Sequence, residues 1–374
     1  MAKKNMSIGR RGFLKHAAAG AAGVAATPLV EAQTRGRTRS PMKIDAWTHT
    51  LTPAYFRHLQ NADSSASGPG SFLLANRALH DLQSRFRVMD AYEDYRQVLT
   101  PIPGPHVWAA GIRDETLADL VRRNNDEMAE TIKKYPSRFA GFAAATPISN
   151  PAAATAEAVR AVRELGALGV QLEEDASEFP LHNGNYDPLF AAMEDLNAAV
   201  WLHPFRTPAS PGYPKEAAPF LLWQVFGWVF DTTITVSRLI FAGVLDRYPR
   251  LKLIVHHGGA MIPHFSGRVG IIPSLTGLDA TLRTALEHLH KTPLEYFKML
   301  YADTAMLGCP HGLRSVLEFF GPGQVLFGTD APLDPSGGAQ FIPATISDVE
   351  AAATDMAVRS AIFGGNAQRV LRIR

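Results

Sequence analysis

The stretch "LKLIVHH", Leu251–His257, decides the fold of this chain. It is a short run rich in apolar and β-branched residues that does not alternate apolar with polar positions, and it ends in two histidines. The stretches "AAVWLHP" (198–204) and "QVLFGTD" (324–330) share this pattern and also end in polar residues. Runs without alternation are typical of strands buried on both faces of a parallel sheet. The pattern therefore predicts a parallel sheet with polar side chains at the carboxyl ends of its strands.

Eight such runs follow one another, separated by helical stretches. We expect strands at 43–47, 96–100, 139–145, 167–172, 199–203, 251–256, 300–304 and 325–329, and helices at 114–135, 151–166, 187–197, 238–248, 312–319 and 347–363. Consecutive β-then-α units predict an α/β fold of the (β/α)8 TIM barrel type. A doubly wound open sheet would normally carry a glycine-rich turn after its first strand, and "WTHTLTP" at that place contains no glycine.

The first residues of the chain have the pattern of an export signal. Arg10 and Arg11 precede a weakly apolar run rich in alanine and glycine, and "VEA" at 30–32 has the small-x-small pattern of a cleavage site. This pattern resembles a bacterial twin-arginine signal, whose route exports folded proteins. The run is too short to span a bilayer well. We therefore expect a signal peptide at 1–32, a flexible leader at 33–42, one barrel domain at 43–374, and a periplasmic protein without membrane insertion.

The charge balance excludes a nucleic-acid partner. The chain has 37 basic and 35 acidic residues, and residues 1–32 hold five of the basic and one of the acidic residues. The remaining chain thus carries 32 basic and 34 acidic residues, so the slight basicity belongs to the expected signal. No basic stripe interleaved with aromatic residues occurs. Cys309 is the only cysteine in the sequence, so an internal disulfide framework is excluded as well.

Polar residues gather where the expected strands end, which is where barrel enzymes place their catalytic groups. His49, His203 and Asp330 come from different strands, and histidine with carboxylate suits Zn²⁺ or a similar divalent ion such as Mn²⁺. We predict these three as the metal ligands, with open positions for water or substrate. His257 is the candidate for proton transfer, because imidazole titrates near neutrality. Its neighbour His256 should point the opposite way if the strand continues through both residues.

Several segments in the same order along the chain carry a family resemblance. They include "KIDAWTHTLTP" (43–53), "VWLHP" (200–204), "HHGGAMIPHFSGR" (256–268), "LYADTA" (300–305), "VLFGTDAPLDP" (325–335) and "GGNAQRVL" (364–371). With these segments the chain resembles the amidohydrolase superfamily. Within it, the chain is most similar to the amidohydrolase-related branch that includes aminocarboxymuconate-semialdehyde decarboxylase and γ-resorcylate decarboxylase.

The resemblance implies a role for each matched residue. His49 matches the second histidine of a His-x-His or Glu-x-His motif, His203 the ligand on the fifth strand, and Asp330 the aspartate after the eighth strand. His257 matches the histidine of the sixth-strand "HGG" turn. Arg268 matches a residue that in some decarboxylases contacts the substrate carboxylate across a dimer interface, which implies a homodimer. An ordinary salt-bridging helix residue is the alternative interpretation of Arg268.

Trp47 departs from the family pattern, which has His or Glu at that place. An indole N–H only donates hydrogen bonds and cannot bind a metal ion as imidazole or carboxylate does. Either three protein ligands hold the ion, as in three-ligand catalytic zinc sites, or the metal site is weakened or lost. Trp47 could also bind substrate by stacking on an aromatic ring.

Two reaction classes suit this set of residues. The resemblance implies a metal-dependent non-oxidative decarboxylase of a small aromatic or unsaturated carboxylate, in which Asp330 and His257 assist protonation of the carbon that loses CO₂. The alternative is a metal-dependent hydrolase of an ester, lactone or amide, and a metal-free binding protein is the third possibility. The fourth-strand segment "VQLEED" lacks a lysine that could be carbamylated to bridge two metals, which argues against a dinuclear hydrolase.

Overall fold

The computed structural model describes residues 41–62, 71–102, 115–173, 180–204 and 221–373. They belong to one compact unit, Ser40–Arg374. The expected signal peptide, and all of the expected leader except its last two residues, lie outside the described residues. Within the described ranges, none of the helices combines the length and apolarity needed to cross a bilayer.

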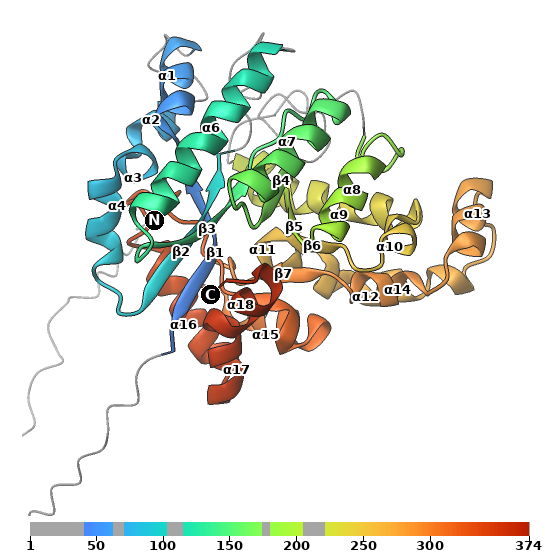
Figure 1. Cartoon of the computed structure of the whole chain (residues 1–374). Coiled ribbons are helices and arrows are strands. Elements are labelled where there is room, and N and C mark those ends of the chain that lie inside the picture. The colour runs from blue at the N-terminus through green and yellow to red at the C-terminus, as the bar shows by residue number, and fades with distance from the viewer. Residues whose placement is uncertain (1–40, 63–70, 103–114, 174–179, 205–220, 374) are drawn as a thin grey trace, which may run out of the picture. The chain divides into compact units, whose positions relative to one another are not determined.

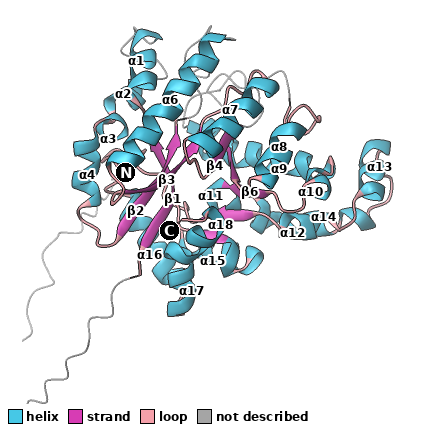
Figure 2. Ribbon diagram, in the orientation of Figure 1, coloured by secondary structure: helices cyan, strands magenta, loops and turns pink. Residues whose placement is uncertain are grey.

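The eight expected strands are present and form one parallel sheet in the order β1 to β8. Figures 1 and 2 show these strands in the centre with helices around them. The predicted (β/α)8 barrel is therefore confirmed. The strands are β1 (Lys43–Thr50), β2 (Tyr95–Pro101), β3 (Phe139–Ala144), β4 (Gly169–Glu173), β5 (Ala199–His203), β6 (Lys252–Val255), β7 (Tyr301–Asp303) and β8 (Val325–Leu326).

The helices agree with the prediction in most places and differ in two. The expected helix 238–248 is split between α9 and α10, because Gly243 adopts a left-handed conformation with φ 71°. The expected helix 347–363 is also split, since the Asp355 side chain accepts hydrogen bonds from the N–H groups of Ala357 and Val358 and so starts a new helix. The helices are α1 (Pro53–Ala62), α2 (Ser71–Ala75), α3 (Arg77–His80), α4 (Leu82–Met89), α6 (Glu115–Lys134), α7 (Pro151–Glu164), α8 (Asp187–Asp195), α9 (Trp228–Phe241), α10 (Val244–Arg247), α11 (His256–Gly259), α12 (Ile262–Gly270), α13 (Ala280–His288), α14 (Pro293–Phe297), α15 (Pro310–Phe320), α16 (Phe341–Ala352), α17 (Met356–Ser360) and α18 (Asn366–Leu371).

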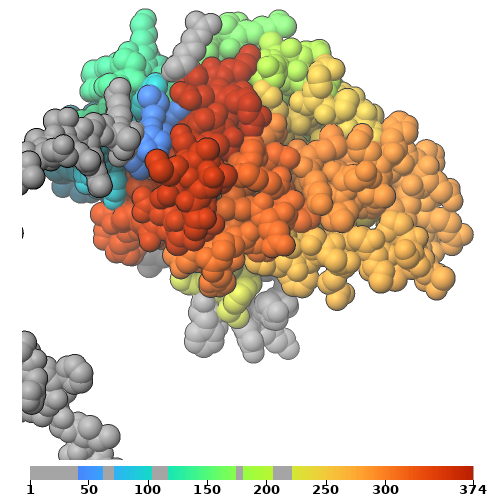
Figure 3. All heavy atoms as spheres, turned by 90° about the horizontal axis from the view of Figure 1, so that it is seen from below, coloured from blue at the N-terminus to red at the C-terminus, as the bar shows by residue number. Residues whose placement is uncertain are grey.

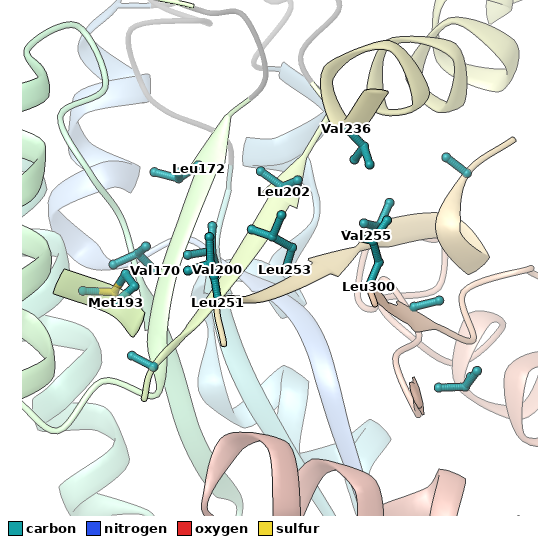
Figure 4. Close-up of a cluster of buried hydrophobic side chains, with 14 of the residues drawn as sticks. Val170, Leu172, Met193, Val200, Leu202, Val236, Leu251, Leu253, Val255 and Leu300 are labelled. Atoms are coloured by element: carbon teal, nitrogen blue, oxygen red, sulfur yellow. The ribbon is translucent and has the colours of Figure 1, made fainter. Parts of the chain in front are cut away.

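Two apolar clusters occupy the two faces of the sheet. The larger lies between strands and helices, where Val200 and Leu202 of β5 pack with residues such as Met193 and Val236 (Figure 4). The smaller fills the barrel interior and includes Trp201 of β5 together with Ala367 and Leu371 of α18. In Figure 3, which looks from below, the orange and red C-terminal residues cover much of this end of the barrel.

The seam between β1 and β8 closes the barrel at the place where the site residues lie. The N–H groups of Ala46 and His49 donate to the carbonyls of Phe327 and Ala331, at 2.7 and 2.8 Å. In return, the N–H of Asp330 donates to the Trp47 carbonyl at 3.2 Å. This seam therefore sets two predicted ligands side by side, although they are 281 positions apart in the sequence.

A bulge in β1 aims its side chains at the barrel mouth. The pairing register with β2 shifts between Asp45 and Thr48, so the alternation of faces is interrupted there. Ile44 and Ala46 belong to the interior cluster, yet Trp47 and His49 also turn toward the histidines of the other strands. A register change of this kind moves side chains to the opposite face of a strand.

Candidate site at the carboxyl ends of the strands

Four sequence-predicted residues come together at the mouth of the barrel. The Nε2 atom of His49 lies 3.2 Å from Oδ1 of Asp330, and Nε2 of His257 lies 3.9 Å from Oδ2 of the same carboxylate. The ring centres of His49 and His203 are 5.1 Å apart. These residues come from β1, β5 and the segments after β6 and β8, so the barrel topology alone brings them together.

Backbone carbonyls fix the tautomers of the two predicted histidine ligands. Nδ1 of His49 lies 3.1 Å from the Pro101 carbonyl, and Nδ1 of His203 lies 2.7 Å from the Pro204 carbonyl. Because a carbonyl oxygen only accepts, each Nδ1 must carry the hydrogen, which leaves the lone pair on Nε2. Burial together with the neighbouring histidines holds the pKa of His203 well below its usual value. Metal-binding histidines are commonly oriented by this kind of contact.

His49 Nε2 and Asp330 Oδ1 face each other so closely that a proton or a cation must lie between them. Within the described residues, neither Nε2 of His49 nor Oδ1 of Asp330 has a hydrogen-bond partner, although both atoms are buried. Two acceptors at 3.2 Å repel each other unless a proton or a cation lies between them. Two ligands of one ion with bonds of ~2.1 Å stand roughly 3.3 Å apart, and two imidazoles bound in this way have ring centres about 5 Å apart.

The donor types and spacings therefore fit a divalent ion, but the arrangement is incomplete. Among the residues that the structure describes, no group of three or more His, Cys, Asp or Glu side chains is placed to hold an ion as it stands. His49 and Asp330 already face each other. His203 has a nitrogen of the right type, but it is not placed to form a group of three with them.

Trp47 occupies the centre of the histidine group and is 1% exposed. Its indole stacks on His256, with ring centres 3.7 Å apart and planes inclined by 17°. It also meets His49, His203 and His257 edge-to-face, with ring centres 5.1 to 5.9 Å apart. Its Nε1 has no hydrogen-bond partner among the described residues. The indole thus contacts all four imidazoles of the group.

The expectation that His256 points the opposite way from His257 depended on a strand that continues through both residues, and it does not apply because β6 ends at Val255. His256 is fully buried against Trp47, and its Nδ1 donates to Oδ2 of Asp303 at 2.9 Å. The Asp303 carboxylate also accepts from the N–H groups of Gly258 and Ala305. Burial holds the pKa of His256 well below its usual value and raises that of Asp303 to about 6.

Two of the predicted residues have an unusual backbone. His257 has φ 54° and Asp330 has φ 62°, a left-handed conformation that residues with a side chain adopt at a cost. His257 lies two residues after β6 and Asp330 four residues after β8, and both side chains line the mouth of the barrel. Strained residues of this kind cluster at functional sites.

A buried polar network behind the site was not predicted from the sequence. Arg85 of α4 donates to the His49 carbonyl at 2.6 Å, to Thr48 Oγ1 at 2.9 Å and to Gln97 Oε1 at 2.7 Å. Asp45 accepts from Thr329 Oγ1 and from Tyr95 OH, each at 2.6 Å. Burial, partly offset by these hydrogen bonds, raises the pKa of Asp45 to about 7. The hydrogen bond between Thr329 and Asp45 in this network joins β1 to the segment after β8.

Arg268 does not join the group within a single chain. It lies exposed near the end of α12 and does not line the cavity beside the histidines. That cavity is small, about 20 Å³, and its lining includes Trp47, His203, His257 and Asp330 together with Phe72, Leu73, Ile102, Trp228 and Leu333. A space of this size holds about one water molecule.

Relatives of the chain match it over most of their length. The γ-resorcylate decarboxylase of Polaromonas sp. (strain JS666) is 29% identical over 311 residues, which cover 80% of this chain and 90% of that protein. A solved 2,6-dihydroxybenzoate decarboxylase, complexed with 2,6-dihydroxybenzoate, superposes with a TM-score of 0.73 at 25% identity. The match covers 89% of this chain and 99% of the other.

A second solved structure has the same fold. The dihydroxybenzoic acid decarboxylase of Polaromonas sp. JS666, with bound manganese and the inhibitor 2-nitroresorcinol, superposes with a TM-score of 0.73 at 24% identity. The match covers 89% of this chain and 97% of that one. The amidohydrolase family matches residues 44–373, which is nearly all of the barrel. This chain therefore belongs to the amidohydrolase family.

Proposed function

We propose that this protein is a metal-dependent non-oxidative decarboxylase of a small aromatic carboxylate, and thus a carbon–carbon lyase. The observation that carries the proposal is the pair of buried acceptors, His49 Nε2 and Asp330 Oδ1, which face each other at 3.2 Å in the mouth of an amidohydrolase barrel. The names of the relatives supply the reaction class, since γ-resorcylate is 2,6-dihydroxybenzoate, a hydroxylated benzoate.

One divalent ion, zinc or manganese, would be held by His49, His203 and Asp330. Such an ion, when bound, supplies positive charge to a carboxylate and an adjacent phenolic oxygen of the substrate. Trp47 contributes no ligand, so the shell would be completed by water and substrate. Trp47 also lines the cavity, so its indole would contact the reacting end of a substrate.

Proton transfer falls to His257 and Asp330. Decarboxylation leaves a carbon that must gain a proton, and both side chains line the cavity in which that carbon would lie. His257 Nε2 is 3.9 Å from Asp330 Oδ2, so a small movement of either group allows a proton to pass between them. Asp303 and His256 would act behind this pair by holding Trp47 and the turn after β6 in position.

A substrate panel tests the reaction class. The purified protein, supplied with Zn²⁺ or Mn²⁺, is incubated with 2-hydroxybenzoate and 2,6-dihydroxybenzoate while release of CO₂ is followed, in parallel with aryl esters and lactones. Release of CO₂ that disappears with a chelator and returns with metal is the expected result. Turnover of esters or lactones alone would establish the hydrolase instead, and activity that resists chelation would establish metal-free chemistry.

A homodimer is proposed together with a role for Arg268. Arg268 is exposed on α12, where Phe265 is also 45% exposed, so this helix could meet a second chain. A guanidinium from the partner could then bind the substrate carboxylate in a bidentate fork. Light scattering should give twice the chain mass, and Arg268→Ala should raise KM with little change in mass. A monomer with full activity would refute this proposal.

Export by the twin-arginine route is proposed from the sequence of residues 1–32. Replacing Arg10 and Arg11 by Lys should leave the protein in the cytoplasm with its leader intact, while the wild-type chain reaches the periplasm and loses its leader. Equal distribution of both proteins would contradict the proposal.

A further inference from the structure

The cavity beside the histidines is too small for any substrate with a ring. Its volume of about 20 Å³ suits a water molecule or a single small group, whereas small-molecule sites in proteins usually measure roughly 300–1,000 Å³. Only the reacting end of a substrate could enter it. The body of the substrate needs a second compartment that adjoins the first.

Such a compartment lies directly alongside. A groove of about 520 Å³ runs between α2–α4 and the segment after β8, and it shares two lining residues, Phe72 and Leu333, with the small cavity. Leu333 follows Asp330 by three positions, and its N–H donates to the Asp330 carbonyl at 3.2 Å. The wall of the groove is thus a continuation of the turn that carries a predicted ligand.

Hydrogen bonds hold the two walls of the groove in place. Asn76 Nδ2 donates across it to the Pro332 carbonyl at 2.6 Å. The buried carboxylate of Asp334 accepts from the N–H groups of Ser336 and Phe341, at 2.7 and 3.0 Å, and so fixes the segment after β8. Hydrogen bonds within the fold therefore define the shape of the groove.

The lining of the groove defines the chemistry of its occupant. Phe72, Ala75, Val88 and Leu333 provide an apolar surface, and Phe72 is 49% exposed. The Arg77 side chain is 75% exposed and pairs with Asp81 at 3.4 Å. The lining holds one cationic and one anionic side chain, Arg77 and Asp334. Because amide hydrogens already occupy the carboxylate of Asp334, Arg77 is the charged donor that the lining presents to a ligand. An aromatic or aliphatic body that ends in an oxygen acceptor fits this lining.

We propose that this groove, lined by Phe72, Ala75, Arg77 and Leu333, is the outer subsite for the part of the substrate remote from the reacting carboxylate. The subsite takes an extended hydroxybenzoate whose far end is apolar or aromatic and bears an oxygen acceptor near Arg77. This inference rests on the proposed decarboxylase function and specifies its substrate class.

Binding of three probe compounds tests the subsite. The probes are 2-hydroxybenzoate, its 4-phenyl derivative, and the same derivative with a carboxylate at the far end of the phenyl ring. In calorimetric titrations of the metal-supplied protein, the phenyl derivative should bind at least tenfold more tightly than 2-hydroxybenzoate, because a second ring enters the groove. The added carboxylate should strengthen binding again, by severalfold.

Two variants, each with a matched control, locate the effect. Ala75→Trp places an indole in the groove from an exposed helix position, so it should abolish the advantage of the phenyl derivative. The affinity of 2-hydroxybenzoate, which has no second ring, should fall much less. Leu275→Ala, at a side chain 46% exposed beside a different groove, should change neither. Arg77→Gln should remove only the gain from the far carboxylate, and Arg57→Gln, at another exposed arginine paired with one carboxylate, should not.

The outcomes separate this inference from the proposed function. If 2-hydroxybenzoate binds and loses CO₂ but the phenyl derivative has no advantage, the subsite is wrong and the decarboxylase stands. The subsite is equally wrong if Ala75→Trp weakens all three probes alike. If none of the probes binds or reacts, both the proposed function and the subsite are overturned.

Discussion

The lower end of the barrel is filled with apolar side chains, whereas the upper end carries polar groups whose hydrogen bonds are incomplete. Strand β5 contributes to both ends from one face. Ala199 and Trp201 pack in the interior cluster beneath α18, and His203, two positions further on, reaches the mouth. Trp201 satisfies its own polar atom by donating from Nε1 to the Ala46 carbonyl at 3.2 Å, but Trp47 leaves Nε1 without a partner among the described residues.

A single strand such as β5 therefore contributes to stability at one end and to the candidate site at the other. At the lower end, buried apolar area stabilises the fold. At the upper end, unpartnered nitrogens and left-handed residues are tolerated because the rest of the barrel holds them. Substitutions at the two ends should therefore have opposite signatures, one in the free energy of unfolding and the other in activity.

The largest effect is expected at the upper end. Asp330→Asn keeps the shape of the side chain but removes the negative charge that faces both His49 and His257. We expect kcat/KM for decarboxylation to fall by about 10³ or more, with a midpoint of urea unfolding no lower than that of the wild type. A variant that keeps a tenth of the activity would place the essential charge elsewhere.

At the lower end of the barrel, we expect a substitution to lower the free energy of unfolding and to leave activity nearly unchanged. Trp201→Ala creates a cavity in the interior cluster and removes the hydrogen bond to Ala46. The free energy of unfolding should drop by about 3–5 kcal/mol, as for other large-to-small core changes. Activity per folded molecule, measured well below the unfolding transition, should stay within threefold of the wild type. A selective loss of activity without loss of stability would contradict the separation of the two ends.

The pH dependence of stability tests the role of Asp45, which belongs to the buried polar network behind the site. Burial raises the pKa of Asp45 from 3.8 to about 7, so between pH ~4 and ~7 the folded state holds a proton that the unfolded state has released. The contribution of Asp45 is therefore complete below pH ~4 and is lost as the pH rises toward 7, at no more than about 1.4 kcal/mol per pH unit. Urea unfolding at pH 5 and pH 7.5 should show a smaller difference for Asp45→Asn than for the wild type. An equal or larger difference in the variant would assign the titration to another group.

A smaller effect is expected from restoring a ligand at the position of Trp47. Trp47→His places an imidazole among His49, His203 and His257, where the indole now lies. The dissociation constant for Zn²⁺, measured by competition with a chromophoric chelator, should fall about tenfold or more. Trp47→Phe is the control and should not tighten binding. Unchanged affinity in both variants would mean that the ion lies away from this position.

Much of the fold and the residues of the site could be predicted, because parallel strands leave continuous apolar runs and barrels gather function at the carboxyl ends of these runs. His203 followed directly from this rule, since β5 begins and ends where expected. His256 did not, because its orientation depends on where β6 stops, which apolarity alone does not fix. Arg85 is distant in sequence from the residues at the barrel mouth and contacts His49 only in the folded chain, so no local sequence pattern identifies it. The bulge in β1 is likewise invisible to an analysis that assumes regular alternation.

The metal content of the purified protein tests the central claim most directly. After expression with added Zn²⁺ or Mn²⁺ and exhaustive dialysis, the wild-type chain should retain about one equivalent of metal, measured by inductively coupled plasma mass spectrometry. His203→Ala should retain less than about a tenth of an equivalent while keeping a cooperative unfolding transition. Equal metal in both proteins, or no metal in the wild type, would show that His49, His203 and Asp330 do not form a metal site.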